Sequence, residues 1–319
     1  MTELSPSPAR NDQEGSIPGM TKPGLRRPNL FIIGAMKSGT STLHAILGTH
    51  PSIYMAKVKE PSHFVEPSQL KVLWPLMEQR GYCHSVDRYL TLFEEAGEAA
   101  FVGESSTAYT KLPRITGVAE RIKAFNPEAR LIYIMRDPVE RAISQYWHRV
   151  RALYEKQDML EAFRSDPTYR DYSNYAMQLQ PYVSLFSADR IKAVTFERMK
   201  EDPAALAQEI FRWLGVDDTF VPPNTDDPQN VTPAYIEKGR GRGLLNRVRR
   251  SRLWDQARPY FPSTVRSLGK RMAMEAVNRR SVPTEQAVAY LRDIQRREVE
   301  TLGQMLGRRF PEWTTLYQR

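Results

Sequence analysis

Residues 29–47 read Asn-Leu-Phe-Ile-Ile-Gly-Ala-Met-Lys-Ser-Gly-Thr-Ser-Thr-Leu-His-Ala-Ile-Leu. The run from Leu30 to Ile33 is apolar and includes β-branched residues, which is typical of a short buried strand. A turn from Gly34 to Gly39 follows, and beyond it apolar residues recur at helical spacing. A strand, a glycine turn and a helix start point backbone N–H groups at an anion, and the helix dipole favours negative charge there. This stretch therefore predicts a cradle for a phosphate or sulfate group.

The same turn is rich in side chains that bind anions. The lysine Lys37 lies inside it, and four hydroxyl residues add donors: Ser38, Thr40, Ser41 and Thr42. In the nucleotide-triphosphate loop a lysine and a hydroxyl follow the second glycine. Here Thr40 follows Gly39, and the lysine comes earlier. A P-loop kinase or NTPase is thus an alternative. The simplest alternative is a strand and a turn that bind no phosphate.

Composition narrows the class of protein. The chain has 319 residues, of which 41% are hydrophobic, enough for a sizeable core. Its single cysteine, Cys83, excludes an internal disulfide framework and a cysteine-rich metal site. The sequence shows neither an apolar run of the ~18 residues that a membrane span needs nor an apolar signal segment. We expect a cytoplasmic protein.

The net charge of +9 is placed unevenly. Residues 236–319 carry 19 Lys and Arg against 8 Asp and Glu. Such a surplus suits an anionic cofactor or substrate, nucleic acid or lipid headgroups, and it also suits a solvated helix face. It leaves open a non-enzymatic anion- or membrane-binding protein, and peripheral contact with the inner face of a membrane through the amphipathic residues 244–271.

Strand and helix signals alternate along the chain. Further strands are indicated at residues 52–55, 101–102, 131–135 and 190–196, with helical segments between them. This order predicts an α/β fold of three layers, P-loop-NTPase-like, with a central and mostly parallel five-stranded sheet flanked by helices. We expect a disordered tail at 1–28 and one domain at 29–319, whose part 236–319 is basic and helical.

A second anion site is predicted where residues 131–135 end. Arg136 follows this strand directly, Asp137 precedes Pro138 as a helix cap, and Ser144 lies within the helix. A guanidinium and a hydroxyl so placed clamp a second phosphate. The simpler interpretation of Arg136 is an ion-pairing arginine.

Two other polar segments follow strand ends, where open α/β sheets place their ligands. In the first, Glu60 and His63 are candidate general bases. A surface ion pair and a structural histidine are the simpler interpretations. In the second, polar side chains are candidate contacts for a substrate: Glu104, Ser105, Ser106 and Tyr109.

The segment Lys238-Gly239-Arg240-Gly241-Arg242-Gly243 places three cations among glycines. A cationic loop of this kind is a candidate lid over an anionic ligand. A nucleic-acid patch and a plain loop are the alternatives.

Together, these residues resemble a known family. Lys37 to Leu43 is similar to the 5′-phosphosulfate loop of sulfotransferases that use 3′-phosphoadenosine 5′-phosphosulfate, and the segment from Arg136 to Tyr146 resembles their 3′-phosphate motif. Glu60 to Phe64 resembles the acidic segment of the bacterial and heparan-sulfate-type branch. The resemblance covers roughly residues 29–315.

The resemblance implies roles for individual residues. Lys37 would neutralise the leaving group, residues 38–42 would hold the 5′-phosphosulfate, and Arg136 with Ser144 would bind the 3′-phosphate. Glu60 would be the base, with His63 as the alternative, and residues 238–240 would match a Lys-Gly-Arg cofactor loop. The product would be 3′-phosphoadenosine 5′-phosphate. No metal is needed, because the transferred group is a monoanion.

The acceptor is left open by the sequence. A base of the acidic type points to a hydroxyl or amine on a small molecule, carbohydrate or lipid, with a carbohydrate or glycolipid favoured. We expect no nucleic-acid partner, and the oligomeric state is not predicted.

Overall fold

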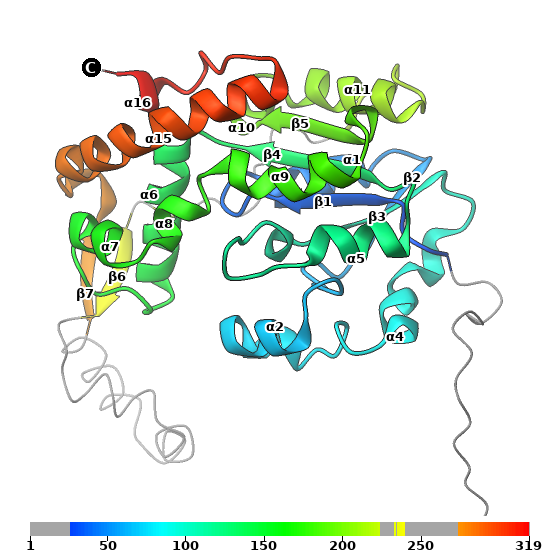
Figure 1. The fold of residues 1–319 in the computed structure, drawn as a ribbon, viewed down its shortest axis with the longest axis horizontal. Coiled ribbons are helices and arrows are strands. Elements are labelled where there is room, and N and C mark those ends of the chain that lie inside the picture. The colour runs from blue at the N-terminus through cyan, green and yellow to red at the C-terminus, as the bar shows by residue number, and fades with distance from the viewer. Residues whose placement is uncertain (1–25, 224–232, 234, 240–273, 319) are drawn as a thin grey trace, which may run out of the picture.

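The structure, a computed structural model, describes residues 26–223, 233, 235–239 and 274–318. Five parallel strands form its central sheet in the order β2-β3-β1-β4-β5 (Figure 1). The strands are β1 (Leu30–Gly34), β2 (Ile53–Met55), β3 (Phe101–Ser105), β4 (Arg130–Met135) and β5 (Ile191–Thr195). The predicted five-stranded parallel sheet is confirmed, with strand limits within a few residues of those expected.

Strand β1 occupies the middle of the sheet. Leu30 pairs with Gly103 of β3 on one side and with Arg130 of β4 on the other. All five residues of β1 are buried. Because the strands are parallel, the segments that follow β1, β3 and β4 meet at one edge of the sheet, where ligands of open α/β folds bind.

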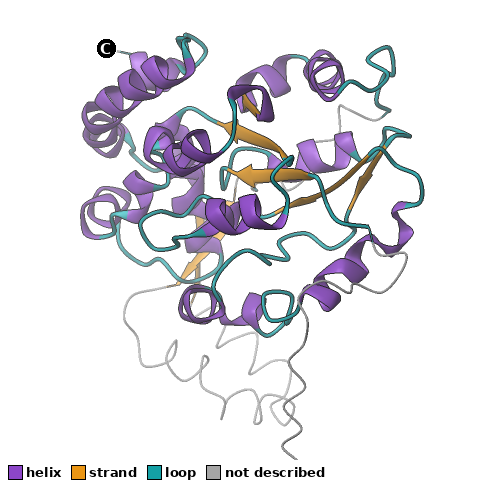
Figure 2. Cartoon of the chain, turned by 45° about the vertical axis from the view of Figure 1, so that its right-hand side comes forward, coloured by secondary structure: helices purple, strands orange, loops and turns teal. Residues whose placement is uncertain are grey.

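Helices cover both faces of the sheet (Figure 2). Successive side chains of β1 point to opposite faces, so Leu30 and Ile32 belong to one apolar cluster and Phe31 and Ile33 to the other. The first cluster includes residues of α1 (Thr40–Leu47), α10 (Phe196–Glu201) and α11 (Pro203–Leu214). The second includes residues of α5 (Val118–Phe125), α6 (Pro138–Arg151) and α9 (Tyr175–Leu185).

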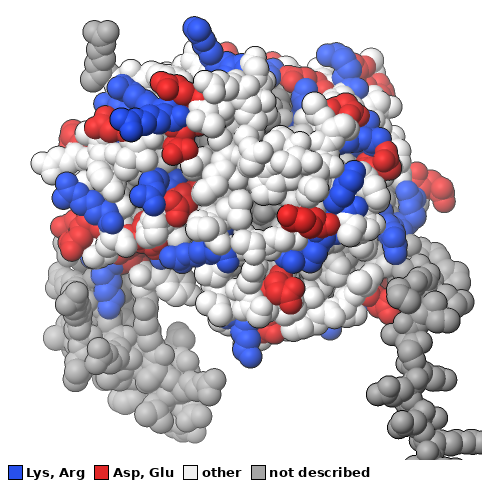
Figure 3. Space-filling view, viewed as in Figure 1, with Lys and Arg blue, Asp and Glu red and all other residues white. Residues whose placement is uncertain are grey.

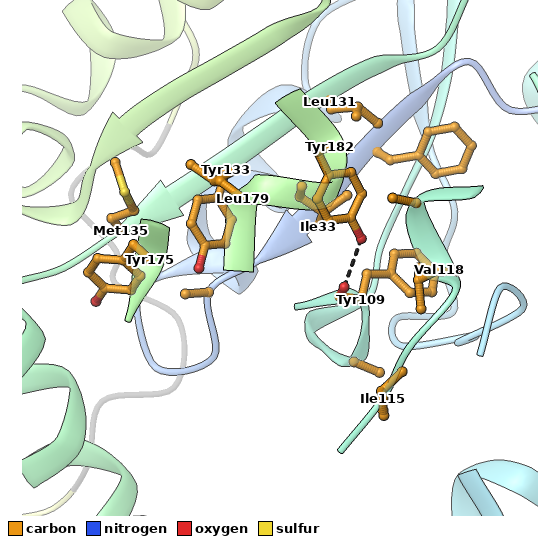
Figure 4. Packing of buried hydrophobic residues seen from close by; sticks show 14 of the residues in the cluster. Ile33, Tyr109, Ile115, Val118, Leu131, Tyr133, Met135, Tyr175, Leu179 and Tyr182 are labelled. Atoms are coloured by element: carbon orange, nitrogen blue, oxygen red, sulfur yellow. Dashed lines mark hydrogen bonds between the residues drawn. The ribbon is translucent and has the colours of Figure 1, made fainter. Parts of the chain in front are cut away.

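The larger cluster is rich in tyrosines (Figure 4). Tyr133 of β4 packs edge-on against Tyr175 of α9, with ring centroids 5.9 Å apart. The Tyr182 hydroxyl donates a hydrogen bond to the carbonyl oxygen of Tyr109 at 2.7 Å. This bond satisfies a buried polar group and ties α9 to the turn that follows β3.

Short helices connect these elements. Residues 65–98 contain α2 (Pro67–Leu73), α3 (Pro75–Glu78), α4 (Val86–Leu90) and the 3-10 turn Thr91–Ala96. Between α6 and α9 lie α7 (Met159–Ser165) and α8 (Thr168–Asp171). No helix among the described residues is long and apolar enough to cross a bilayer.

The basic C-terminal part is not purely helical, which corrects the prediction for residues 236–319. β6 (Tyr235–Gly239) and β7 (Met274–Asn278) pair antiparallel in a separate small sheet. α15 (Glu285–Leu306) follows and packs against α6, α7 and α9, and α16 (Thr314–Tyr317) ends the described chain. β6 was not predicted from the local sequence, because its partner strand β7 follows only after residues 240–273.

Several predictions concern residues outside the described chain. These are the predicted tail up to residue 25, the segment 240–243 of the candidate lid, and residues 244–271 of the candidate membrane surface.

On the face drawn in Figure 3, the described Lys, Arg, Asp and Glu side chains are intermixed. This face therefore shows no large patch of one sign.

Asp137 joins β4, α6 and the C-terminal end of the chain. One carboxylate oxygen accepts from the N–H groups of Val139 at 3.0 Å and Glu140 at 3.3 Å, so the predicted helix cap is confirmed. The other oxygen accepts from the N–H of Leu316 at 2.9 Å. Trp313, just before α16, is fully buried and donates to Glu197 at 3.2 Å. The end of the chain is thus tied to the start of α6.

We predict that Asp137→Ala lowers the free energy of unfolding by about 2–4 kcal/mol, because a cap and a buried backbone partner are lost together. Asp202→Ala is the matched control, since Asp202 caps α11 through one N–H, that of Ala205 at 2.8 Å. Its loss should be about 1 kcal/mol. Denaturant unfolding of both variants measures the difference, and equal losses would contradict the role given to Leu316.

Candidate active site

The loop after β1 has the backbone of an anion cradle. Lys37 has φ 68° and Gly39 has φ 89°, both in the left-handed region. A Cβ atom at Gly39 would lie 2.5 Å from Cε of Met199 and 2.7 Å from Cδ2 of Phe196, so only glycine fits there. α1 begins directly afterwards at Thr40, with no acidic residue in its first turn. The predicted strand, turn and helix start are confirmed.

The buried hydroxyl of Ser38 indicates that this loop binds an anion. The Ser38 side chain is fully buried, and its hydroxyl has no hydrogen-bond partner among the described residues. Buried hydroxyls nearly always have a partner. An oxyanion in the loop would provide the acceptor, so the residues present fit a phosphate or sulfate group.

Positive charge gathers around Lys37. Burial lowers the pKa of Lys37, and nearby guanidinium groups lower it further, those of Arg136, Arg151, Arg141 and Arg279. Partial desolvation, followed by the charges of Lys37 and Arg151, lowers the pKa of His148 to about 4. The site therefore holds cations that repel one another and that an anionic ligand would stabilise.

Arg136 is held at the end of β4. The hydroxyl of Tyr175 donates to its carbonyl oxygen at 2.6 Å. Its guanidinium lies 3.1 Å from Glu140 and 5.0 Å from the centre of the Phe196 ring. The N–H of Ala35 donates to the carbonyl of Ile134 at 2.7 Å, which ties the loop after β1 to β4. The two predicted anion motifs are thus neighbours.

Helix α6 presents further candidate residues. Ser144 is partly buried and lies one helical turn after Arg141 and two turns before Arg151, so the three share a face of α6. Arg151 was not selected from the sequence, and this helical spacing is the signal that could have identified it. β6, which contains Lys238 and Gly239, packs against α6. Lys238 and Gly239 thus belong to a strand rather than to a glycine-rich lid, and Arg240 lies outside the described residues.

Glu60 is held beside the segment that follows β3. Its N–H donates to the carbonyl of Ser105 at 2.9 Å. Its carboxylate accepts from the N–H of Thr107 at 2.8 Å and from the Thr107 hydroxyl at 3.3 Å. Burial raises the pKa of Glu60, while the Lys59 charge and the Thr107 bonds act in the opposite direction. A carboxylate with a raised pKa is a stronger base, as a general base requires.

His63 occupies a different environment. Its ring stacks on Tyr89, with centroids 4.0 Å apart and planes 6° from parallel, and it contacts Phe64 and Phe125. Its Nδ1 lies 2.6 Å from the carbonyl oxygen of Tyr82. Burial lowers the pKa of His63. The surroundings favour a packing role for His63, and Glu60 stays the preferred candidate base.

The four predicted substrate contacts are brought together, but they are buried. Glu104, Ser105 and Ser106 are 0% exposed and Tyr109 is 3% exposed. Ser105 Oγ lies 2.7 Å from Nδ1 of His44, and the other three bond to one another. Because they are buried and bonded to other protein groups, we expect these residues to support neighbouring parts of the site and not to contact an acceptor.

Two lysines that the sequence analysis did not select lie at the site. Lys59 donates to the hydroxyl of Ser41 at 2.6 Å, which links the acidic segment to α1. Lys111 is 1% exposed, its ammonium has no hydrogen-bond partner among the described residues, and it lies 4.2 Å from the centre of the Tyr172 ring. Burial lowers the pKa of Lys111 well below its usual value, followed by the charge of Arg141. No local pattern marks either residue.

A model of the sulfotransferase family matches residues 28–220. The chain belongs to the sulfotransferase family. The match contains the loop after β1, the Glu60 segment and the start of α6, so the family predicted from the motifs is confirmed. The described C-terminal elements from β6 onward lie beyond the matched residues.

Relatives from animals and a bacterium agree with this membership. A bifunctional heparan sulfate N-deacetylase/N-sulfotransferase 2 from Bos taurus is 26% identical over 60% of this chain and 22% of its own length. A heparan sulfate glucosamine 3-O-sulfotransferase 3A1 from Mus musculus is 28% identical over 64% and 50%. The chain thus spans between about a fifth and half of these relatives. A sulfotransferase from Alicyclobacillus acidocaldarius has a crystal structure with TM-score 0.61 and 25% identity, covering 91% of this chain and 99% of that one.

The crowding of cations predicts that Lys37 destabilises the ligand-free protein. A lysine whose pKa is lowered by folding opposes folding below its folded pKa, and this effect disappears as the pH rises to the unfolded value. Lys37→Met should therefore stabilise the ligand-free protein at about pH 7 by more than the ~0.5 kcal/mol typical of surface changes. The gain should shrink as the pH approaches 10.5, the ordinary pKa of lysine.

Denaturant unfolding at neutral and alkaline pH measures this effect. Lys71→Met, at an exposed position of α2, is the control and should change stability little at either pH. A loss of stability for Lys37→Met at neutral pH would contradict the crowding of charge.

Proposed function

We propose that this protein transfers a sulfuryl group from 3′-phosphoadenosine 5′-phosphosulfate to a hydroxyl or amine of an acceptor, with Glu60 as the base. One observation carries the proposal: cations gather around Lys37 at the sheet edge, among them the fully buried Arg141, and a carboxylate with a raised pKa lies beside the neighbouring strand. Family membership supports the reaction class.

The donor would be held at its two anionic ends. Ser38, Gly39, Thr40, Ser41 and Thr42 would bind the 5′ end through backbone N–H groups and hydroxyls. Arg136 and Ser144 would bind the 3′-phosphate. Lys238 and Gly239, in the strand beside α6, are further candidate contacts, together with Arg240, which lies outside the described residues. When bound, the donor supplies a sulfuryl group on a phosphate leaving group, and 3′-phosphoadenosine 5′-phosphate is the product. No metal is required by this chemistry.

The chain supplies charge neutralisation and proton removal. Glu60 would take the proton of the acceptor hydroxyl as the oxygen of that hydroxyl bonds to sulfur and the bond from sulfur to the phosphate oxygen breaks. Lys37 stabilises the negative charge that develops on that phosphate oxygen. Both groups act from fixed positions, so positioning and electrostatics account for the rate, as in phosphoryl transfer.

A carbohydrate is the acceptor class that the relatives favour. Two of them are named for heparan sulfate, one as an N-sulfotransferase and one as a 3-O-sulfotransferase. Both a sugar hydroxyl and a sugar amine are therefore represented. Small molecules and lipids are the other acceptors to screen, and peripheral membrane contact and a cytoplasmic location stay predictions.

The kinase alternative is weakened by Asp137. A kinase of this type holds Mg²⁺ with an aspartate at a neighbouring strand end. Both carboxylate oxygens of Asp137 accept backbone N–H groups, those of Val139 and Glu140 on one side and Leu316 on the other. Asp137 is therefore engaged in holding the fold.

The proposal is tested by incubating the protein with the donor and a metabolite extract of the source cells. Mass spectrometry should detect compounds heavier by one sulfuryl group. Glu60→Gln should slow their formation by roughly 10²–10⁴-fold, because a general base is lost. Calorimetry with 3′-phosphoadenosine 5′-phosphate should show unchanged binding.

Glu66→Gln is the matched control, because Glu66 follows in the same segment but is exposed. Its turnover should equal that of the unaltered protein. Full activity of Glu60→Gln would show that another residue is the base. If the folded protein does not bind 3′-phosphoadenosine 5′-phosphate, the proposed function is overturned.

Arg136→Ala should weaken binding of 3′-phosphoadenosine 5′-phosphate by about 10–100-fold, since a charge-assisted contact to phosphate is lost. The control is Arg198→Ala, an arginine on α10 that pairs with Glu209 at 2.6 Å. Calorimetry should give the control an unaltered affinity. Equal effects of the two variants would contradict a specific contact at Arg136.

A further inference from the structure

Glu104, at the carboxyl end of β3, is a fully buried carboxyl group that the proposed reaction does not use. One of its oxygens accepts from the hydroxyls of Tyr109 and Tyr89, the latter at 3.3 Å. The other accepts from the Ser106 hydroxyl at 2.8 Å. All three partners are donors in this arrangement, which suits an ionised carboxylate.

The same partners reach the loop that carries Glu60. Ser106 Oγ, while donating to Glu104, accepts from the N–H of Ser62 at 3.0 Å. The next residue, Thr107, donates its N–H to the Glu60 carboxylate at 2.8 Å. The two carboxylates are therefore held by two successive residues of one segment.

The Glu60 loop needs such support. Glu60 has φ 54° and Ser62 has φ 55°, and neither is glycine. Left-handed backbone at such residues costs of order 1–3 kcal/mol each and persists when surrounding contacts fix it. The Ser62 N–H to Ser106 bond is one of these contacts, and the stacking of His63 on Tyr89 is another.

We propose that Glu104 is a positioning residue for Glu60: its buried carboxylate fixes the Glu60 loop through Ser106 and places a negative charge beside the base. This inference rests on the proposed function, in which Glu60 accepts the acceptor proton. Glu104 itself is 0% exposed, so it would act through its protein neighbours and not by direct contact with donor or acceptor.

Charge coupling follows from the arrangement. Burial raises the pKa of Glu104 to about 7, the three hydroxyl donors lower it, and the charge of Glu60 raises it. Interaction between two charges is reciprocal, so an ionised Glu104 raises the pKa of Glu60. The groups that oppose this at Glu60 are Lys59 and Lys111. Arg80 binds the carbonyl oxygen of Glu60 at 3.1 Å, and the neutral ring of His63 packs alongside.

The test is carbon-13 NMR of protein labelled at the glutamate carboxyl carbons and titrated with pH. The signals of Glu60 and Glu104 are those missing from Glu60→Gln and from Glu104→Gln. In Glu60→Gln, the titration midpoint of Glu104 should fall, since the like charge of Glu60 is removed. Binding of 3′-phosphoadenosine 5′-phosphate, measured by calorimetry, should stay unchanged.

Glu155→Gln is the matched control. Glu155 is 8% exposed, and it accepts from the Tyr169 hydroxyl at 2.9 Å and from the N–H of Gln157 at 3.0 Å. It thus has the same chemistry as Glu104 at a place that does not contact the Glu60 loop. The Glu104 midpoint should not move in this variant.

Tyr109→Phe is the second variant. It removes one hydroxyl donor from Glu104, so the Glu104 midpoint should rise. A Glu104 midpoint that stays fixed in folded Glu60→Gln would overturn the inference. If the unaltered protein does not bind 3′-phosphoadenosine 5′-phosphate, the proposed function fails instead, whatever the midpoints show.

Discussion

The site depends on positive charge that the described chain compensates only in part, since Arg136 pairs with Glu140. Lys37 is held in a left-handed turn and lies within the field of Arg136, Arg141 and Arg151. Arg141 is fully buried and donates hydrogen bonds to neutral partners, the Ser173 hydroxyl, the Gln145 amide and a backbone carbonyl. Such charges persist in a fold only when the surrounding structure is rigid, and they make an anionic ligand the natural complement.

The residues around these cations fix the backbone that carries them. Asp137 caps α6 and ties the end of the chain to it, and Tyr175 fixes the backbone at Arg136. On the other side of β1, the segment after β3 holds Glu60 through Thr107. A cluster of cations and a carboxylate of raised pKa therefore lie at one sheet edge, after neighbouring strands. This separation of roles agrees with a reaction that needs leaving-group neutralisation and one base.

Local sequence was sufficient for much of this. The order of strand, glycine turn and helix at β1, and of Arg136, Asp137 and Pro138 at α6, depends on neighbouring residues, and both were predicted. Contacts between distant segments were not. Lys111 and Glu104 gain their properties from burial by other elements, and β6 pairs with a strand beyond residues 240–273. His63 was selected for its chemistry, yet the rings of Tyr89 and Phe125 enclose it, which no sequence spacing reveals.

The central claim is that one ligand with two anionic ends fits the loop after β1 and the start of α6 together. Its most direct test is a calorimetric comparison, without Mg²⁺, of 3′-phosphoadenosine 5′-phosphate and adenosine 5′-monophosphate, which lacks the 3′-phosphate. We predict that the bisphosphate binds at least about 100-fold more tightly, as expected from a second charge-assisted phosphate contact. Equal affinities, or tighter binding of ATP with Mg²⁺, would contradict the account.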